Sequence, residues 1–328
     1  MSTVATLTPS NVSEERVKFL ASPTFNPQFR YSEPISSSSL TAYGTPKPTT
    51  LAIANEIIER TFQKFTTTEL LENQGSVVSQ PLVAKQIDQF LRLHNLEQKY
   101  DVTFSSSYIS KASVTATHLK LRLPINYREQ TLQAMLYHEV GTHIIRRVNY
   151  EVQPWFKKKK NFGFSEYLQT EEGLATLHAR LPLSYKGAAA QALHYLAISI
   201  AQQDSFLAVW HALEPFVHLP DRRWALAVRA KRGMQDTSQP GGYTKDLLYL
   251  EGMLEVWHWL AEREFDVTPL YFGKLAIQDV DKALQLNPHF QPQLPLFFSK
   301  NRQKYIQLMK EIGQENGFST THYYGPTV

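Results

Sequence analysis

The chain has 328 residues, of which 42% are hydrophobic and 20% are charged, and its formal net charge is +4. These values are typical of a soluble globular protein with one large domain or two. The absence of cysteine excludes a disulfide framework and any thiolate metal site, so a bound metal would need His, Asp or Glu ligands.

The first twenty residues lack the basic start and apolar core of a secretion signal, and no window approaches eighteen consecutive apolar residues. We therefore expect a cytoplasmic protein that neither spans a membrane nor binds one. Basic residues gather at 157–160 and 222–233, where they favour either a solvated face or an acidic partner. Nucleic acid is not an expected partner.

Residues 1–49 are rich in Ser, Thr and Pro without sustained periodicity, which predicts an extended N-terminal arm. Within it, Phe25, Phe29 and Tyr31 are expected to pack onto the rest of the protein. Residues 50–328 are predicted to form a single domain.

Apolar residues recur at helical spacing over 51–65, and Pro81 marks the start of a second helix that extends to Asn95. Residues 100–123 are rich in Val, Thr, Tyr and Phe with partial alternation, which predicts strands. After Pro124 the pattern is helical. The expected helices are 126–149, 170–180, 188–203, 222–231, 244–264, 280–286 and 299–312.

The helix over 126–149 opens with a capping-box arrangement of Asn126 and Glu129 and contains the sequence HEVGTH from His138 to His143. In the common zinc-protease motif the two histidines are four residues apart and lie about 40° apart around the helix. A spacing of five residues on a regular helix separates them by about 140°, too far to share a metal.

A π-bulge would bring residues five apart onto one face, and Gly141 between the histidines eases such a distortion. We therefore predict a bulged helix with both imidazoles on one side. Glu139 would then lie beside the metal as the general base that takes a proton from water. The alternative is a chance pair on an ordinary helix, since the chain has eleven histidines.

A catalytic zinc site usually has a third protein ligand. The sequence EEGLA, which begins at Glu171, resembles the Asn-Glu-Gly-Phe-Ala-like segment from which gluzincin aminopeptidases take a glutamate ligand. By that likeness Glu172 is the ligand. Glu171 is left to orient a ligand histidine or to contact substrate. His178 falls off the ligand face of a regular helix and is predicted to be structural.

Together, HExxxH, EEGLA, the segment GGYTKDLLYLEG at 241–252 and the early NPQFRY resemble the tyrosine carboxypeptidase family that includes the microtubule-associated tyrosine carboxypeptidases. Bacterial relatives are often labelled by a QEGLA motif, in which the glutamine corresponds to Glu171. The motifs extend from Asn26 to Gly252, and the last seventy-odd residues carry none that we can place.

The resemblance implies a zinc metallocarboxypeptidase that releases a C-terminal tyrosine or phenylalanine from a peptide or protein. In the characterised animal members the substrate is the acidic tail of α-tubulin. It further implies an α+β, mainly helical, zincin-like (gluzincin-type) fold. We expect a small antiparallel sheet beside the active-site helix, and residues 50–328 as the catalytic metallopeptidase domain.

A carboxypeptidase needs a cation for the terminal carboxylate of its substrate. The candidates are Arg146, Arg232 and Lys245, and an exposed helix charge is the alternative for Arg146. Tyr243 or Tyr249 would donate to the oxyanion, unless they are ordinary core residues. Two other functions remain open. One is a non-catalytic regulatory protein with a structural metal, and the other is a zinc aminopeptidase in which Glu171 holds the substrate amine.

Overall fold

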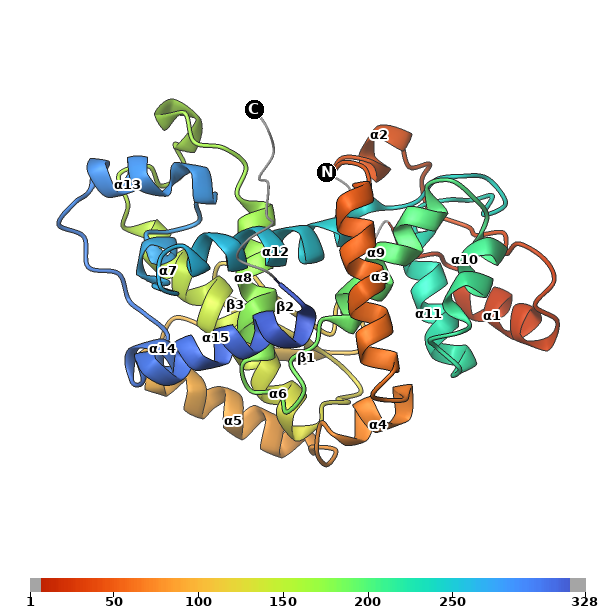
Figure 1. Cartoon of the computed structure of the whole chain (residues 1–328), viewed down its shortest axis with the longest axis horizontal. Coiled ribbons are helices and arrows are strands. Elements are labelled where there is room, and N and C mark those ends of the chain that lie inside the picture. Colours follow the sequence, from red (N-terminus) through yellow and green to blue (C-terminus); the bar gives the residue numbers. More distant parts are fainter. Residues whose placement is uncertain (1–6, 319–328) are drawn as a thin grey trace. The chain divides into compact units, whose positions relative to one another are not determined.

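Helices make up most of the regular structure in this computed structural model, which describes residues 7–318 (Figure 1). Contacts between residues divide the chain into two compact units, one built from residues 7–71 and 188–250 and the other from residues 72–187 and 251–318. Neither unit begins at residue 50, the predicted start of the single domain. No helix in residues 7–318 combines the length and the apolar character needed to cross a membrane.

The first unit is helical. Its elements are α1 (Val12–Ala21), α2 (Ser37–Leu40), α3 (Pro48–Phe62), α4 (Thr67–Glu72), α9 (Ala189–Ala201), α10 (Phe206–Leu213), α11 (Pro220–Ala230), η3 (Thr244–Asp246) and the start of α12 (Leu247–Ala261). Helix α3 lies against α9, which also contacts α10 and α11. A proline at the first turn starts both α3 and α11, because the missing N–H has no partner at that position anyway.

The sequence predicts an extended N-terminal segment, but the segment is not extended throughout, because α1 forms within it. Phe19 on α1 is fully buried and meets the Phe206 ring edge-on at a centroid distance of 5.1 Å. The expected packing of the arm is confirmed for Phe29, which is 3% exposed, and for Tyr31, whose hydroxyl accepts the N–H of Gly233 at 2.8 Å. Burial of aromatic side chains against distant residues stabilises α1, although the segment has only a weak helical pattern of its own.

The second unit contains the sheet and the helix with the two histidines. Its elements are α5 (Gln80–Leu93), β1 (Asp101–Ser105), β2 (Ala112–Val114), β3 (His118–Arg122), α6 (Glu129–Met135), η1 (Leu136–Ile144), α7 (Ile145–Glu151), η2 (Lys159–Phe162), α8 (Leu168–Arg180), the rest of α12, η4 (Thr268–Tyr271), η5 (Ile277–Asp279), α13 (Val280–Leu286), α14 (Leu296–Ser299) and α15 (Arg302–Asn316). The α+β class is therefore confirmed.

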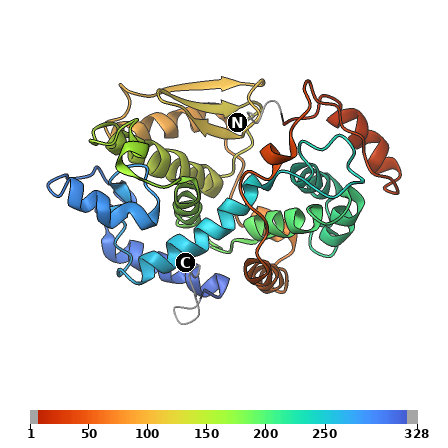
Figure 2. The same ribbon diagram turned by 90° about the horizontal axis from the view of Figure 1, so that it is seen from above.

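The sheet is mixed, which corrects the expected antiparallel arrangement. Strand β3 lies between the other two, parallel to β1 and antiparallel to β2 (Figure 2). The chain passes from β1 to the far edge before it returns through the centre, so β1 and β2 are not neighbours. Edge strand β2 contacts η1, as expected of a sheet beside this helix.

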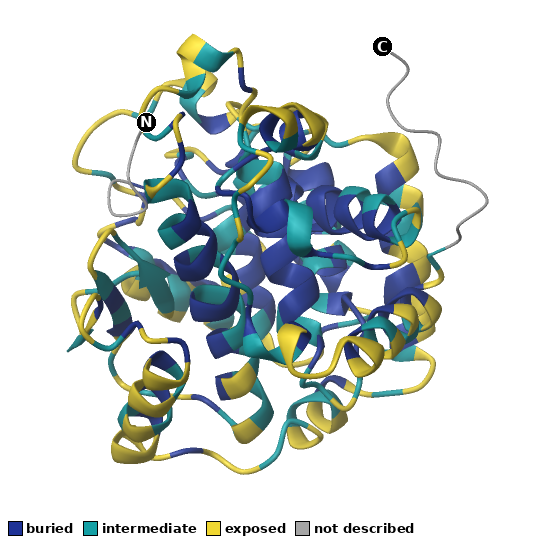
Figure 3. Ribbon diagram, turned by 90° about the vertical axis from the view of Figure 1, so that its left-hand side faces the viewer, coloured by how far each residue is buried: buried dark blue, intermediate teal, exposed yellow. Residues whose placement is uncertain are grey.

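Helix α8 approaches α12 at two glycines from the recognised motifs. A Cβ atom on Gly173 would lie 2.2 Å from the backbone of Gly252, and one on Gly252 would lie 2.1 Å from the carbonyl oxygen of Gln169. The two helices can be this close only because neither residue has a side chain. Buried residues line the inner faces of such packed helices, and exposed residues occupy the outer turns (Figure 3).

His94 connects the end of α5 to the first residue of α14 and is predicted to make stability depend on pH. Its Nδ1–H donates to the carbonyl of Phe90 at 2.9 Å, and its Nε2 accepts the N–H of Leu296 at 3.1 Å. Burial lowers the pKa of His94, and repulsion from Lys300 adds to this effect. The folded state therefore holds the neutral ring.

In the unfolded chain the His94 pKa returns to about 6.5, so below that pH the unfolded state binds a proton that the folded state resists. From this residue alone, we expect the free energy of unfolding to fall by up to about 1 kcal/mol between about pH 7 and pH 5.5. Urea unfolding at both pH values measures the change. His94→Gln should lose this part of the pH dependence, whereas replacing the exposed His211 by glutamine should not. Equal pH dependence in all three proteins would contradict the assignment.

Candidate metal centre

The segment from Leu136 to Ile144 is a π-helix, continuous with α6 before it and α7 after it. The rings of His138 and His143 lie on the same side, with centroids 4.8 Å apart. The predicted bulge between the two histidines is therefore confirmed. Five residues complete slightly more than one turn of this wider helix, so the spacing that separates two side chains on an α-helix aligns them here.

Side chains around the π-helix explain why it forms here. The hydroxyl of Thr142 donates to the carbonyl of Tyr137 at 2.9 Å, five residues earlier. Because this hydroxyl is the donor, its oxygen accepts from Nδ1 of the fully buried His178, whose Nε2 then accepts from the hydroxyl of Tyr305. These contacts match the structural role predicted for His178.

Gly141 lies inside the widened turn with the ring of Phe297 packed against it. A Cβ atom at this position would lie 2.6 Å from Cε1 of Phe297. The sequence suggests only that the glycine eases distortion of the backbone. In the structure it also leaves room for a ring from α14 next to the bulge.

Glu172, in the first half of α8, completes a group of three potential metal ligands. Its Oε2 lies 3.9 Å from Nε2 of His138 and 3.8 Å from Nε2 of His143, and the ligand atoms are all within 4.8 Å of one another. Ligand atoms about 2.0–2.2 Å from a tetrahedral zinc are separated by roughly 3.3–3.6 Å. Small side-chain movements would bring the three atoms to that spacing, so the residues fit a zinc ion.

The site favours the neutral form of one histidine. Burial, with a smaller contribution from the adjacent His143, lowers the pKa of His138 to about 4. A neutral imidazole is the form that binds metal. The pKa of His143 is instead raised, because the carboxylates of Glu171, Glu172 and Glu139 together outweigh the effect of burial. The charge of Glu139 also opposes the lowering of the His138 pKa. Glu139 itself lies on η1 with an intermediate exposure.

Glu171 lies behind His143. Its Oε1 is 2.8 Å from Nδ1 of His143, and its carboxylate also accepts hydrogen bonds from Arg146 and Lys274. Burial alone would raise the pKa of Glu171, but Lys274 and Arg146 outweigh burial and hold that pKa well below its ordinary value. An ionised Glu171 accepts Nδ1–H from His143, which leaves Nε2 of the ring for a metal.

The structure does not fit the expected contact of Arg146 with a substrate carboxylate. Arg146 is 0% exposed, and its guanidinium donates to Glu171 and to the carbonyls of Leu270 and Leu275. A side chain that has no exposed surface and whose three nitrogens all donate to internal acceptors is not available to a ligand. Its position one turn after His143 serves the interior of the protein.

The remaining predicted substrate contacts belong to the first unit, whereas the three ligands belong to the second. These residues are Arg232, Tyr243, Lys245 and Tyr249. Tyr243 is 6% exposed and packs with Leu7 and Leu40.

Sequence reasoning missed Tyr271 and Lys274. Tyr271 contacts the π-helix and Lys274 contacts Glu171, yet both lie about a hundred residues after Glu171 in a stretch without a recognisable motif.

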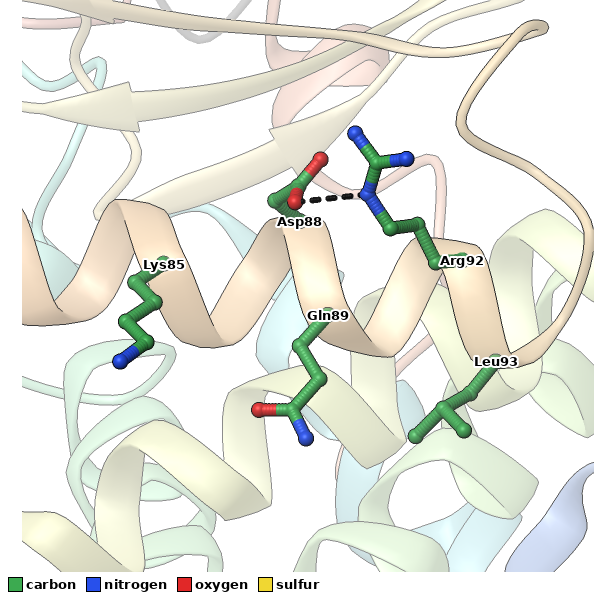
Figure 4. A pocket seen from close by; sticks show the side chains of 5 residues that line it. All are labelled: Lys85, Asp88, Gln89, Arg92 and Leu93. Carbon is green, nitrogen blue, oxygen red and sulfur yellow. Dashed lines mark hydrogen bonds and ion pairs between the residues drawn. The ribbon is translucent and has the colours of Figure 1, made fainter.

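A pocket elsewhere in this unit is lined by one face of α5, where Asp88 and Arg92 form an ion pair at 2.8 Å (Figure 4). The residues that line this pocket include no histidine and no glutamate, unlike the cluster of His138, His143 and Glu172.

The family model described as "Microtubule-associated tyrosine carboxypeptidase" matches residues 30–312. The chain belongs to this family. The resemblance seen in the sequence is thereby confirmed, and the match includes both the three candidate ligands and the later residues Tyr271 and Lys274.

Three relatives share the family name. Microtubule-associated tyrosine carboxypeptidase 1 from Mus musculus is 32% identical over 318 residues, which cover 94% of this chain and 68% of the relative. The protein of the same name from Rattus norvegicus is 33% identical over 321 residues, with the same coverage of 94% and 68%. The one from Homo sapiens is 34% identical over 293 residues, which cover 86% of this chain and 61% of the relative.

Proposed function

We propose that this protein is a zinc metallocarboxypeptidase of zincin-like, gluzincin-type architecture that releases a C-terminal tyrosine or phenylalanine from a peptide or protein. The observation that carries the proposal is the convergence of His138, His143 and Glu172 on one small volume, with Glu139 beside it on the π-helix. Family membership supports the choice of reaction, since the relatives are named tyrosine carboxypeptidases.

In this proposal His138, His143 and Glu172 hold zinc, which when bound supplies Lewis-acid activation of water and of the substrate carbonyl. Glu139 accepts a proton from the attacking water as the new C–O bond forms. It then donates that proton to the leaving nitrogen as the C–N bond breaks, so one side chain serves first as base and then as acid. Glu171 keeps the ring of His143 oriented throughout.

The substrate backbone is expected to pair with β2. This strand is at the edge of the sheet and contacts the π-helix η1, so an extended peptide added to the strand would pass close to that helix. Pairing of this kind uses main-chain groups and does not select side chains. Selection for an aromatic terminal residue therefore needs a separate pocket near the metal.

Arg232 and Lys245 as contacts for the terminal carboxylate, and Tyr243 or Tyr249 as the oxyanion donor, stay predictions from the sequence alone. The relatives' names associate them with microtubules, and on that basis we propose that this protein is cytoplasmic and acts on a peptide or protein with an acidic tail, such as that of tubulin. The exposed lysines among residues 157–160 are compatible with an acidic partner.

The zinc aminopeptidase alternative loses support from the placement of Glu171. That role requires a carboxylate free to bind a substrate amine, but Glu171 is 2% exposed and already accepts from three side chains. The structural-metal alternative does not account for Glu139, because a structural site needs ligands but no base.

Replacing His143 by alanine tests the site and the function together. We expect His143→Ala to lose most of its zinc and its release of terminal tyrosine, because one of three protein ligands is gone. Elemental analysis and mass spectrometry of a peptide ending in tyrosine measure the two effects. The matched control is His211→Ala, since this ring is mostly exposed and lies in the first unit. Unchanged zinc content in His143→Ala would remove His143 from the site.

A further inference from the structure

The segment from Leu270 to Leu275 is bound to α7, the helix that directly follows the π-helix. Arg146, just after the π-helix, donates from Nε to the carbonyl of Leu270 at 2.8 Å and from Nη2 to the carbonyl of Leu275 at 2.9 Å. One fully buried guanidinium therefore holds both ends of this six-residue segment. Two side chains between these ends make contacts next to His143: Tyr271 with the backbone of Gly141, and Lys274 with Glu171.

Tyr271 acts on the backbone before His143. Its hydroxyl donates to the carbonyl of Gly141 at 2.6 Å, and the residue is 0% exposed. This carbonyl belongs to the widened turn, two residues before His143. A hydrogen bond to it, buried away from water, favours the π-helical backbone that aligns His143 with His138.

Lys274 acts on the ring of His143 through Glu171. Its Nζ donates to Oε1 of Glu171, the same oxygen that lies 2.8 Å from Nδ1 of His143. The ammonium thus holds this oxygen where it can accept Nδ1–H, and Nε2 of the same ring faces Glu172.

The segment is itself immobilised by packing. Phe272 and Leu275 are 5% and 1% exposed and belong to a buried cluster with Trp155 and Phe164. Gly273 between them has a φ of +122°, and a Cβ atom there would lie 3.2 Å from Cα of Tyr150. The close approach to α7 therefore depends on glycine, and it places Tyr271 and Lys274 on a rigid base.

We propose that Tyr271 and Lys274 are positioning residues that together set the orientation of His143 as a metal ligand, one through the backbone of the π-helix and one through Glu171. The inference rests on the proposed function, because it requires His143 to bind zinc. It also gives a role to a part of the chain in which the sequence shows no motif.

The test compares the zinc affinity of purified wild-type protein with that of Tyr271→Phe and Lys274→Met, measured by competition with a chelator. We expect each variant to bind zinc about 10-fold to 100-fold more weakly, the usual effect of removing a group that orients a ligand. Lys274→Arg should recover most of the affinity, because it keeps a cation beside Glu171.

Two matched controls separate orientation of the metal ligand from general stability. Tyr100→Phe removes a buried hydroxyl that has no hydrogen-bond partner within residues 7–318, and Lys99→Met removes a surface ion pair with Glu151. Both should bind zinc as the wild type does. The visible spectrum of the cobalt-loaded protein reports the ligand arrangement directly, and it should change in Tyr271→Phe and Lys274→Met but not in either control.

The outcomes distinguish this inference from the proposed function. Wild-type protein that binds no zinc would overturn both. Wild-type protein that binds zinc, with unchanged affinity and cobalt spectrum in folded Tyr271→Phe and Lys274→Met, would overturn only the positioning roles. If Tyr271→Phe does not fold, Lys274→Met decides alone, because Lys274 is partly exposed and its loss leaves the core intact.

Discussion

Glu139→Gln is expected to lower the rate of terminal-residue release by about 10²-fold to 10⁴-fold, the usual contribution of a general base. The amide keeps the size of the side chain but cannot accept a proton from water. Zinc content should stay at the wild-type level, because His138, His143 and Glu172 are the proposed ligands. Single-turnover assays on a peptide ending in tyrosine, combined with elemental analysis, measure both quantities.

The matched control for this prediction is Glu262→Gln, since Glu262 has a side chain that is 75% exposed. It should leave both rate and zinc content unchanged. A Glu139→Gln protein with the wild-type rate would show that Glu139 is not the base. Loss of zinc from this variant would instead indicate that Glu139 is a ligand.

Arg146→Met should be among the most destabilising substitutions in the second unit. It removes one of the two cations beside buried Glu171 and leaves the carbonyls of Leu270 and Leu275 without their donor. Breaking a buried ion pair from one side typically costs about 3–5 kcal/mol. Lys274 still contacts Glu171 and should keep the loss towards the lower end of that range. Denaturant unfolding measures the change.

The double variant Arg146→Met with Glu171→Gln provides the control. Since the glutamine at position 171 carries no buried charge, we expect the double variant to lose less stability than the sum of the two single losses. A single-variant loss below about 1 kcal/mol would contradict the role assigned to Arg146, because a surface charge typically contributes no more than this.

Local patterns in the sequence predict much of this protein. The strands within residues 100–123 and most of the longer helices after residue 47 follow from periodicity and turn residues. The short helices α4 and α14 were not predicted. The π-helix also follows from local information, since a five-residue spacing with Gly141 between the histidines is incompatible with a shared site on an α-helix. Helix α10 was missed because its sequence, FLAVWHAL, is apolar almost all round and lacks a helical stripe.

Long-range contacts could not be predicted in the same way. A helix position near the histidines suggests that Arg146 meets substrate, but its partners at 171, 270 and 275 turn it inward. The central place of β3 in the sheet likewise depends on how the chain crosses after β1, which no alternation pattern records. Tyr271 and Lys274 gain their significance only from the fold, since an isolated tyrosine or lysine has no signature of its own.

The central claim is that the zinc-loaded protein removes one residue from a free C-terminus. The most direct measurement incubates it with three forms of one peptide ending in tyrosine: unmodified, C-terminally amidated and N-terminally acetylated. Mass spectrometry should show loss of the single terminal tyrosine from the unmodified and acetylated peptides, no loss from the amide, and no reaction after chelation of the metal. An intact unmodified peptide, or release from the N-terminus, would contradict the account.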